Sequence, residues 1–304
     1  MSARLGRVLA AVVSDLHLGT HSGADLLRSP EVQAKLFDAL SDADEVVLLG
    51  DTVELRDASL AGSLERALPF FEALGAALGS RRLTIVPGNH DHRLAEDALR
   101  RARHLGLEQR FEVRRGDALE PVARRMGGSP VVLAYPGLWV RDDVYATHGH
   151  YLDCHSEAPT FECRARGLVE RIRRLDHDGY GSPRDYERAL APIYRLIHWG
   201  VQPAAVRAAA HMGRRLVRRW ERPRAEPGAR IRFGVPAMER VVHNLGIDAR
   251  HVLFGHLHGP GRWETRSGVE LVNTGCWVED PVSVSPGTCV LVPNEGPPRL
   301  QSVL

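Results

Sequence analysis

Five short clusters of metal-binding side chains occur along the sequence, and each follows a short apolar run. They are Asp15-Leu16-His17, Gly50-Asp51, Gly88-Asn89-His90-Asp91, His148-Gly149-His150 and Gly255-His256-Leu257-His258. Divalent cations are bound by oxygen and imidazole donors, and a site for two ions needs a carboxylate that bridges them. The clusters supply donors of both kinds, so they are candidates for a metal site that holds two ions.

The spacing within two of the clusters favours binding to a single ion. Asp15 and His17 are separated by one residue, as are His256 and His258. Alternate side chains of an extended segment point to the same side, so both members of each pair can reach one ion. A single Asp-x-His is more often structural, but five clusters in this order, each closing a strand, indicate a common site.

The segments between the clusters predict the elements that position them. Apolar runs over residues 8–13, 45–49, 83–86, 143–146 and 252–254 have the length of buried strands, and residues 30–40 and 60–78 have helical spacing. Alternating strands and helices predict an α/β sheet with helices outside it. Ligands of such sheets bind where loops leave the carboxyl ends of the strands, which is where the clusters lie. The tail, with apolar runs over 269–272 and 288–292, predicts antiparallel strands.

A helical, arginine-rich insertion is expected over residues 155–245, within a single domain that spans residues 1–304. Its central part, residues 161–232, contains 17 arginines and 8 acidic residues, although the net charge of the whole chain is only +2. Residues 203–220 read as an amphipathic helix. The insertion either packs on the core with its arginines in solvent, or forms a cap over the site that meets a diphosphate or anionic lipid. Contact with a membrane surface is a further alternative. His150, Arg164 and Arg166 are the candidate substrate-binding residues.

The four cysteines contain no C-x-x-C pair and suggest a reducing compartment. The sequence contains no apolar run of about 18 residues, which is the length that a membrane-spanning helix needs. We therefore expect a cytoplasmic protein, with peripheral contact at the inner face of the membrane as an alternative.

The ordered set D-x-H, GD, GNHD, H and GHxH resembles the signature of the calcineurin-like metallophosphoesterases, over about four-fifths of the chain. The resemblance implies a four-layer αββα sandwich of two mixed sheets with a dinuclear site at the strand ends. It assigns the first ion to Asp15, His17 and His258, and the second to Asn89, His148 and His256, with Asp51 as the bridge. It also implies that His90 contacts the leaving group or a phosphate oxygen, and that Asp91 orients His90.

The expected reaction is in-line attack by a hydroxide that bridges two divalent ions, with Mn²⁺ as the first choice and Fe or Zn²⁺ as alternatives. His90, held in one tautomer by a carboxylate, would give a proton to the departing alkoxide. The substrate would be a small phosphodiester, pyrophosphate or phosphomonoester.

The form Gly50-Asp51-x-x-Glu54, with Glu54 where many family members have Asp, is similar to the UDP-2,3-diacylglucosamine pyrophosphatase branch. That branch implies a lipid-diphosphate substrate, but it usually has GNRD where this chain has His90. Two alternatives are a DNA-processing nuclease on the same scaffold and a non-catalytic interaction scaffold. Neither is preferred. The nuclease is disfavoured because aromatic stacking residues are lacking between the arginines, and no stable nucleic-acid complex is expected. The non-catalytic scaffold is disfavoured because the predicted ligands and His90 are all present.

Overall fold

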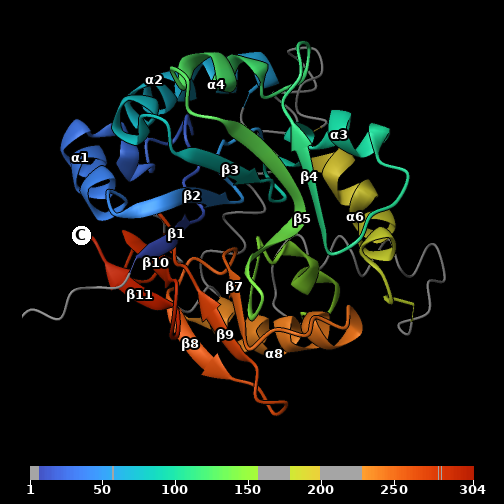
Figure 1. The fold of residues 1–304 in the computed structure, drawn as a ribbon. Helices are drawn as coiled ribbons and strands as arrows, with labels where there is room; N and C mark the ends of the chain where they lie inside the picture. Colours follow the sequence, from blue (N-terminus) through green and yellow to red (C-terminus); the bar gives the residue numbers. More distant parts are fainter. Residues whose placement is uncertain (1–6, 57, 157–178, 199–227, 280, 282) are drawn as a thin grey trace, which may run out of the picture.

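The structure is a computed structural model that describes residues 7–56, 58–156, 179–198, 228–279, 281 and 283–304 (Figure 1). Its strands are β1 (Val8–Val13), β2 (Ala43–Leu49), β3 (Arg82–Val86), β4 (Glu108–Glu112), β5 (Val131–Arg141), β6 (Val144–Thr147), β7 (His251–Phe254), β8 (Gly261–Glu264), β9 (Glu270–Asn273), β10 (Thr288–Pro293) and β11 (Arg299–Ser302). Its α-helices are α1 (Pro30–Ala39), α2 (Leu60–Leu78), α3 (Glu96–Arg101), α4 (Glu120–Arg125), α6 (Pro183–His198) and α8 (Ala229–Asn244). Short 3-10 turns are η1 (Leu26–Arg28), η2 (His92–Leu94) and η3 (His150–Cys154).

The strands form a mixed sheet in two halves. They are hydrogen-bonded in the order β11-β10-β1-β2-β3-β5-β6-β7-β9-β8, and β4 pairs with β5. One half contains the parallel strands β1, β2 and β3, and the other contains the parallel strands β6, β7 and β9. The ladder is continuous because the long strand β5 pairs with β3 through Val131–Leu133 and with β6 through Gly137–Arg141.

Three apolar cores separate four layers. Alternate side chains of a strand point to opposite faces, so β2 places Val46 and Leu48 in the core under α2 and α4, and Val47 in the core between the sheet halves. In the same way β7 places Leu253 in the central core and Phe254 in the core under α6 and α8. Figure 1 shows α1, α2 and α4 on one side of the strands and α8 on the other. The predicted mixed α/β class is therefore confirmed, with the two halves of the sandwich joined through β5.

Several element boundaries agree closely with the sequence-based expectations. The helix predicted over residues 60–78 is α2, whose N-cap Ser59 accepts a hydrogen bond from the backbone of Gly62. The two apolar runs in the tail form β9 and β10. As predicted, β9 pairs antiparallel with β8, and β10 pairs antiparallel with β11. The other edge of β9 pairs in parallel with β7. Within the expected insertion, α6 and α8 are described. The amphipathic helix predicted over 203–220 lies outside the described residues, as do Arg164 and Arg166.

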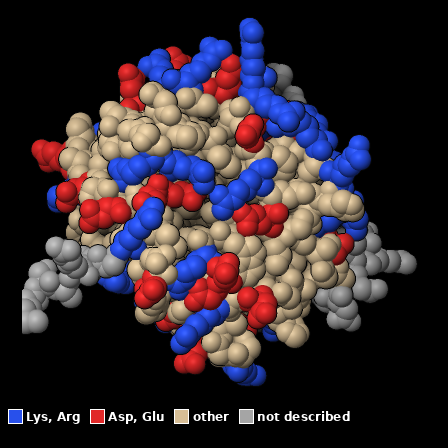
Figure 2. Space-filling model, viewed as in Figure 1, with Lys and Arg blue, Asp and Glu red and all other residues tan. Residues whose placement is uncertain are grey.

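The face of the molecule in Figure 2 carries arginine and acidic side chains interspersed with one another. Surface ion pairs of this kind include Arg110 with Glu108 and Arg262 with Glu270. None of the described helices is long and apolar enough to cross a membrane.

Candidate metal centre

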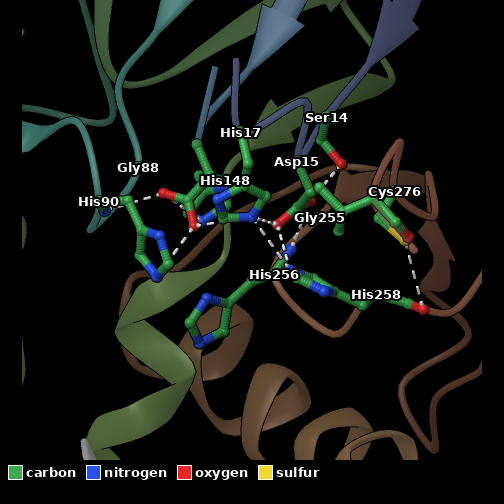
Figure 3. A network of polar contacts seen from close by, with 12 residues as sticks. Ser14, Asp15, His17, Gly88, His90, His148, Gly255, His256, His258 and Cys276 are labelled. Atoms are coloured by element: carbon green, nitrogen blue, oxygen red, sulfur yellow. Dashed lines mark hydrogen bonds and ion pairs between the residues drawn. The ribbon is translucent and has the colours of Figure 1, made fainter. Parts of the chain in front are cut away.

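The seven predicted metal ligands lie together at the carboxyl ends of five strands. Asp15 and His17 follow β1, Asp51 follows β2, Asn89 follows β3, His148 follows β6, and His256 and His258 follow β7. Figure 3 shows most of these side chains meeting in one polar network. Their loops are hydrogen-bonded to one another. The Asp15 and His17 amides donate to the Gly50 and Asp51 carbonyls, at 3.0 and 2.8 Å, and the Gly255 amide donates to the His148 carbonyl.

The first group of donors consists of Asp15, His17 and His258, whose ligand atoms all lie within 4.8 Å of one another. Nε2 of His258 is 3.3 Å from Nε2 of His17 and 3.3 Å from Oδ1 of Asp15. Oδ1 of Asp15 is buried without a hydrogen-bond partner, while Oδ2 is held by the Ser14 hydroxyl and the His256 amide. A buried carboxylate oxygen that faces two imidazole nitrogens suits a cation, so these three residues fit the predicted first ion.

The second group consists of Asp51, His148 and His256, again with ligand atoms within 4.8 Å of one another. Oδ1 of Asn89 adds a further metal-ligating atom, 3.2 Å from Nε2 of His148. Nδ1 of His148 lies 3.0 Å from the Leu49 carbonyl oxygen and donates to it, which leaves Nε2 for an ion.

Asp51, a member of the second group, also faces the first group. Its Oδ1 is 3.4 Å from Nε2 of His148, and its Oδ2 is 3.9 Å from Nε2 of His17. A carboxylate with one oxygen toward each group has the arrangement that a bridging ligand needs.

The backbone at the ligands adopts a conformation that side chains rarely take. Of the six non-glycine residues with positive φ in the described chain, five are predicted ligands, namely Asp15, His17, Asp51, His256 and His258, with φ between 46° and 69°. Such residues each cost about 1–3 kcal/mol and cluster at functional sites, where the surrounding structure enforces them. The strain therefore marks the same residues as the donor chemistry.

Two motif glycines permit the close approach of the ligands. A Cβ atom at Gly88 would lie 2.3 Å from Oδ1 of Asp51 and 2.6 Å from Cδ2 of His148. A Cβ atom at Gly255 would lie 2.4 Å from Oδ2 of Asp15. All three distances are shorter than real Cβ contacts, so a side chain at either position would displace the predicted ligands.

The buried carboxylates stay ionised. Burial by itself raises the pKa of Asp15, but the close approach of His258 and the charge of His148 outweigh it and lower the pKa to about 2. Burial likewise raises the pKa of Asp51, yet the neighbouring histidines hold it well below the usual value. Burial alone lowers the pKa of His148, but the adjacent Asp51 raises it to about 10. The site therefore contains two buried carboxylates charged at neutral pH, and these attract cations.

Glu54 orients two histidines at once. Its Oε2 is 2.9 Å from Nδ1 of His90 and 3.2 Å from Nδ1 of His17. The other nitrogen of His90, Nε2, faces the metal ligands and lies 3.7 Å from Oδ2 of Asp51. His17, Glu54 and His90 also form a third group of ligand-type atoms. These hydrogen bonds account for that group without an ion.

Asp91 contacts the backbone of the neighbouring loops. Its carboxylate accepts hydrogen bonds from the backbone amides of Thr52, Val53 and Gly88, at 2.7, 3.3 and 2.6 Å. Asp91 thus holds the loops after β2 and β3 together, and Glu54 is the carboxylate that contacts His90. Burial and the charge of Asp51 raise the pKa of Asp91 to about 6.

The position of His150 does not support its predicted contact with substrate. The side chain is only 1% exposed and packs against Tyr135 and Tyr151. Burial and the charge of His148 hold the pKa of His150 well below its usual value.

Two further residues around the site were missed. Asp153 on η3 lies 3.1 Å from Nε2 of His256, and Glu54 contacts the rings of His17 and His90. Glu54 could have been found as a carboxylate three residues after Asp51 on the same loop, whereas Asp153 is 103 residues from its partner.

Comparison with known proteins agrees with these motifs. A sequence profile described as calcineurin-like phosphoesterase matches residues 9–260. A search of curated proteins found no match.

Three solved structures show a distant overall likeness. A dimetal phosphatase from Danio rerio is 12% identical, with 98% of this chain and 100% of that chain covered and a TM-score of 0.44. A conserved uncharacterized protein from Streptococcus pneumoniae, a predicted phosphoesterase, is 13% identical, with 94% and 83% covered and a TM-score of 0.33. The nuclease MPE of Pseudomonas putida is 16% identical, with 93% and 84% covered and a TM-score of 0.32. At such scores the assignment rests on the profile match, which covers most of the sequence. The chain belongs to the calcineurin-like phosphoesterase family and is a phosphoester hydrolase.

Proposed function

We propose that the chain hydrolyses a small phosphodiester, pyrophosphate or phosphomonoester, lipid diphosphates included, at a site that holds two divalent ions, with Mn²⁺ as the expected metal. The observation that carries the proposal is the position of Asp51 between two groups of buried donors, each of which has the composition of a metal site. Asp15, His17 and His258 would hold one ion. Asn89, His148 and His256 would hold the other.

The ions would activate a water molecule and neutralise the phosphoryl oxygens. The remaining work falls to the residues of the chain. Asp15 is held by Ser14 and by the His256 amide, and His148 by the Leu49 carbonyl, so these donors are oriented before any ion binds. Such preorganisation removes the cost of arranging the ligands during the reaction.

His90 is the proposed proton donor to the leaving group. With its Nδ1–H directed at Glu54, the ring presents Nε2 toward the metal ligands, where a phosphoryl group would bind. Burial, and then the charge of Arg56, lower the pKa of His90 in the free protein. The negative charge of a bound phosphoryl group raises the pKa of His90 again. When substrate is bound, Nε2 therefore gains the proton that it later donates to the leaving group.

The test uses metal-stripped protein refilled with Mn²⁺ and assayed with bis-p-nitrophenyl phosphate and p-nitrophenyl phosphate. The protein should bind two ions and hydrolyse at least one ester only when metal is present. Asp51→Asn should abolish hydrolysis because the bridging charge is lost. Asp142→Asn, the same change at an exposed residue of the β5–β6 turn, is the matched control.

Failure to bind any metal would contradict the proposal. Full activity in Asp51→Asn would remove Asp51 from its proposed role. Two bound ions with no turnover of either ester would exclude these simple esters and direct the search to pyrophosphates, which a screen of nucleotide and lipid diphosphates covers.

A further inference from the structure

A largely buried carboxylate on the first described helix of the expected insertion contacts three separate parts of the core. Glu187 on α6 lies 2.9 Å from Nε2 of His92, and it accepts hydrogen bonds from the hydroxyl groups of Tyr151, at 2.7 Å, and Tyr135. Only 15% of the Glu187 side chain is exposed. Neither the metal-ligand motifs nor the proposed reaction accounts for this carboxylate.

The partners of Glu187 adjoin two of the ligand-bearing loops. His92 begins η2, directly after the segment that carries Asn89 and His90. Tyr151 lies in η3, directly after His148-Gly149. One carboxylate therefore joins the chain just after Asn89 to the chain just after His148, and both of those residues belong to the second group of donors.

The helix α6 holds His92 by a second contact. The Tyr194 ring, seven residues after Glu187 on the same helix, stacks on the His92 ring with the centroids 4.0 Å apart and the planes at 20°. Residues seven apart lie on the same face of a helix, so one face of α6 holds His92 by a hydrogen bond and a ring stack together. Such paired contacts restrict both the position and the rotation of the ring.

The charge of Glu187 is retained despite its burial. Burial by itself raises the pKa of this carboxyl, but the charge of His92 and the donors around it lower the pKa below the usual value. A buried anion that accepts three hydrogen bonds is far more restrictive than a neutral acceptor, because hydrogen bonds to charged groups are the strong ones.

By contrast, the first-ion residues Asp15 and His17 are positioned from another direction. Their backbone amides are bound by the loop after β2, and His17 Nδ1 is bound by Glu54 on that loop. The contacts that support Asp15 and His17 therefore do not involve Glu187.

We propose that Glu187 is a positioning residue for the second ion, fixing the loops that carry Asn89 and His148. The inference rests on the proposed two-ion function and deepens it. It gives the start of the insertion a defined task, which is to shape one half of the metal centre.

The test is a calorimetric titration of metal-stripped protein with Mn²⁺, which resolves two classes of site without any activity assay. The class that disappears in Asn89→Ala identifies the second ion. Glu187→Gln should leave the first affinity unchanged and weaken the second about 10-fold or more, as supporting residues around metal ligands commonly do. Tyr151→Phe, which removes one donor and no charge, should weaken the second class in the same direction by a smaller factor.

Asp185→Asn is the matched control, since it removes a carboxylate from the same helix. Asp185 pairs with Ser182 and Arg188 rather than with the core, and its loss should leave both affinities unchanged. An unchanged first affinity also shows that each variant is folded. If Glu187→Gln fails to fold, Tyr151→Phe decides the question.

The outcomes are separable. If the wild type binds two ions and Glu187→Gln binds the second ion with wild-type affinity, the inference is overturned and the proposed function stands. If Glu187→Gln lowers the Mn²⁺ affinity of both classes equally, and Asp185→Asn does the same, the effect is a general one of charge and the inference is also overturned. Fewer than two ions in the wild type ends both the inference and the proposed function.

Discussion

The carboxylate of Glu54 lies 2.9 Å from Nδ1 of His90, and the same oxygen lies 3.2 Å from Nδ1 of His17. A neutral imidazole that donates from Nδ1 presents a lone pair at Nε2. One carboxylate thus sets the tautomer of a proposed metal ligand and of the proposed proton donor. Arg56 in turn binds Glu54 through its backbone amide and guanidinium, which keeps the carboxylate in place.

Glu54→Gln should lower kcat by about 10–100-fold, because supporting residues around catalytic and metal-bound histidines have effects of this size. The neutral amide of the glutamine lacks the negative charge with which Glu54 accepts hydrogen bonds from both imidazole rings. Hydrolysis of bis-p-nitrophenyl phosphate at saturating Mn²⁺ measures the effect. Glu65→Gln, at an exposed position of α2, should retain wild-type kcat, and equal rates for the two variants would rule out the positioning role of Glu54.

His90→Ala should lower kcat by about 10²–10⁴-fold while both ions still bind, because the lost step is proton transfer rather than metal binding. The deficit should shrink for an ester whose leaving group needs no proton, such as p-nitrophenolate, relative to an alkyl ester. Rates for an aryl and an alkyl phosphodiester measure this. His104→Ala removes an exposed histidine and serves as the control. A deficit of the same size for both esters would argue against proton donation by His90.

Gly88→Ala should destabilise the metal-free protein by about 1–3 kcal/mol, as overpacking of an interior commonly does. The added Cβ would overlap Oδ1 of Asp51, so the affinity for metal should also fall. Urea unfolding and Mn²⁺ titration measure the two effects. Gly106→Ala has open space at its Cβ and should change neither quantity. Wild-type stability and affinity in Gly88→Ala would show that the ligands do not need this close approach.

Metal binding should release a proton from His148. Burial alone lowers the pKa of this histidine, but Asp51 raises it to about 10, so its ring is protonated at neutral pH in the metal-free protein. An ion binds only the neutral ring, so affinity should rise as pH rises toward about 10, roughly tenfold per unit for each proton released. Calorimetry in two buffers of different ionisation enthalpy counts the protons. His148→Gln should release one fewer than the wild type, whereas His104→Ala should match it. An unchanged count in His148→Gln would assign the proton to another group.

The stabilising effect of Glu187 should depend on pH. The folded-state pKa of Glu187 is below its ordinary value of 4.5, so its contribution is present above that value and is lost as pH falls through the lowered folded-state pKa. Near neutral pH, metal-free wild type should exceed Glu187→Gln in unfolding free energy by about 1–3 kcal/mol. Urea unfolding in steps below pH 4.5 should show the difference narrowing. A difference that stays constant with pH would mean that the charge of Glu187 contributes nothing to stability.

Local sequence was sufficient to place the predicted metal ligands at the ends of strands and to indicate the class of fold. The apolar runs before Asp15, Asp51 and Asn89 mark buried parallel strands, and parallel strands bring their following loops to one edge. The strands β4, β5, β8 and β11 were not anticipated. The side chains of β4, β8 and β11 are partly exposed, and their apolar pattern is too weak to distinguish them from loops.

Roles that depend on contacts between distant segments were decided only by the tertiary structure. Asp91 and Glu54 are both carboxylates near His90 in the sequence, and only the folded loops show that Asp91 accepts from backbone amides while Glu54 meets the ring. Glu187 is 95 residues from His92 and has no local pattern that marks it. Which metal-binding side chains follow which strands could be inferred locally, because strand formation and side-chain chemistry are local properties. The partner of each buried charge was decided by the packing of whole layers, because a buried polar group takes whichever partner the fold brings within hydrogen-bonding distance.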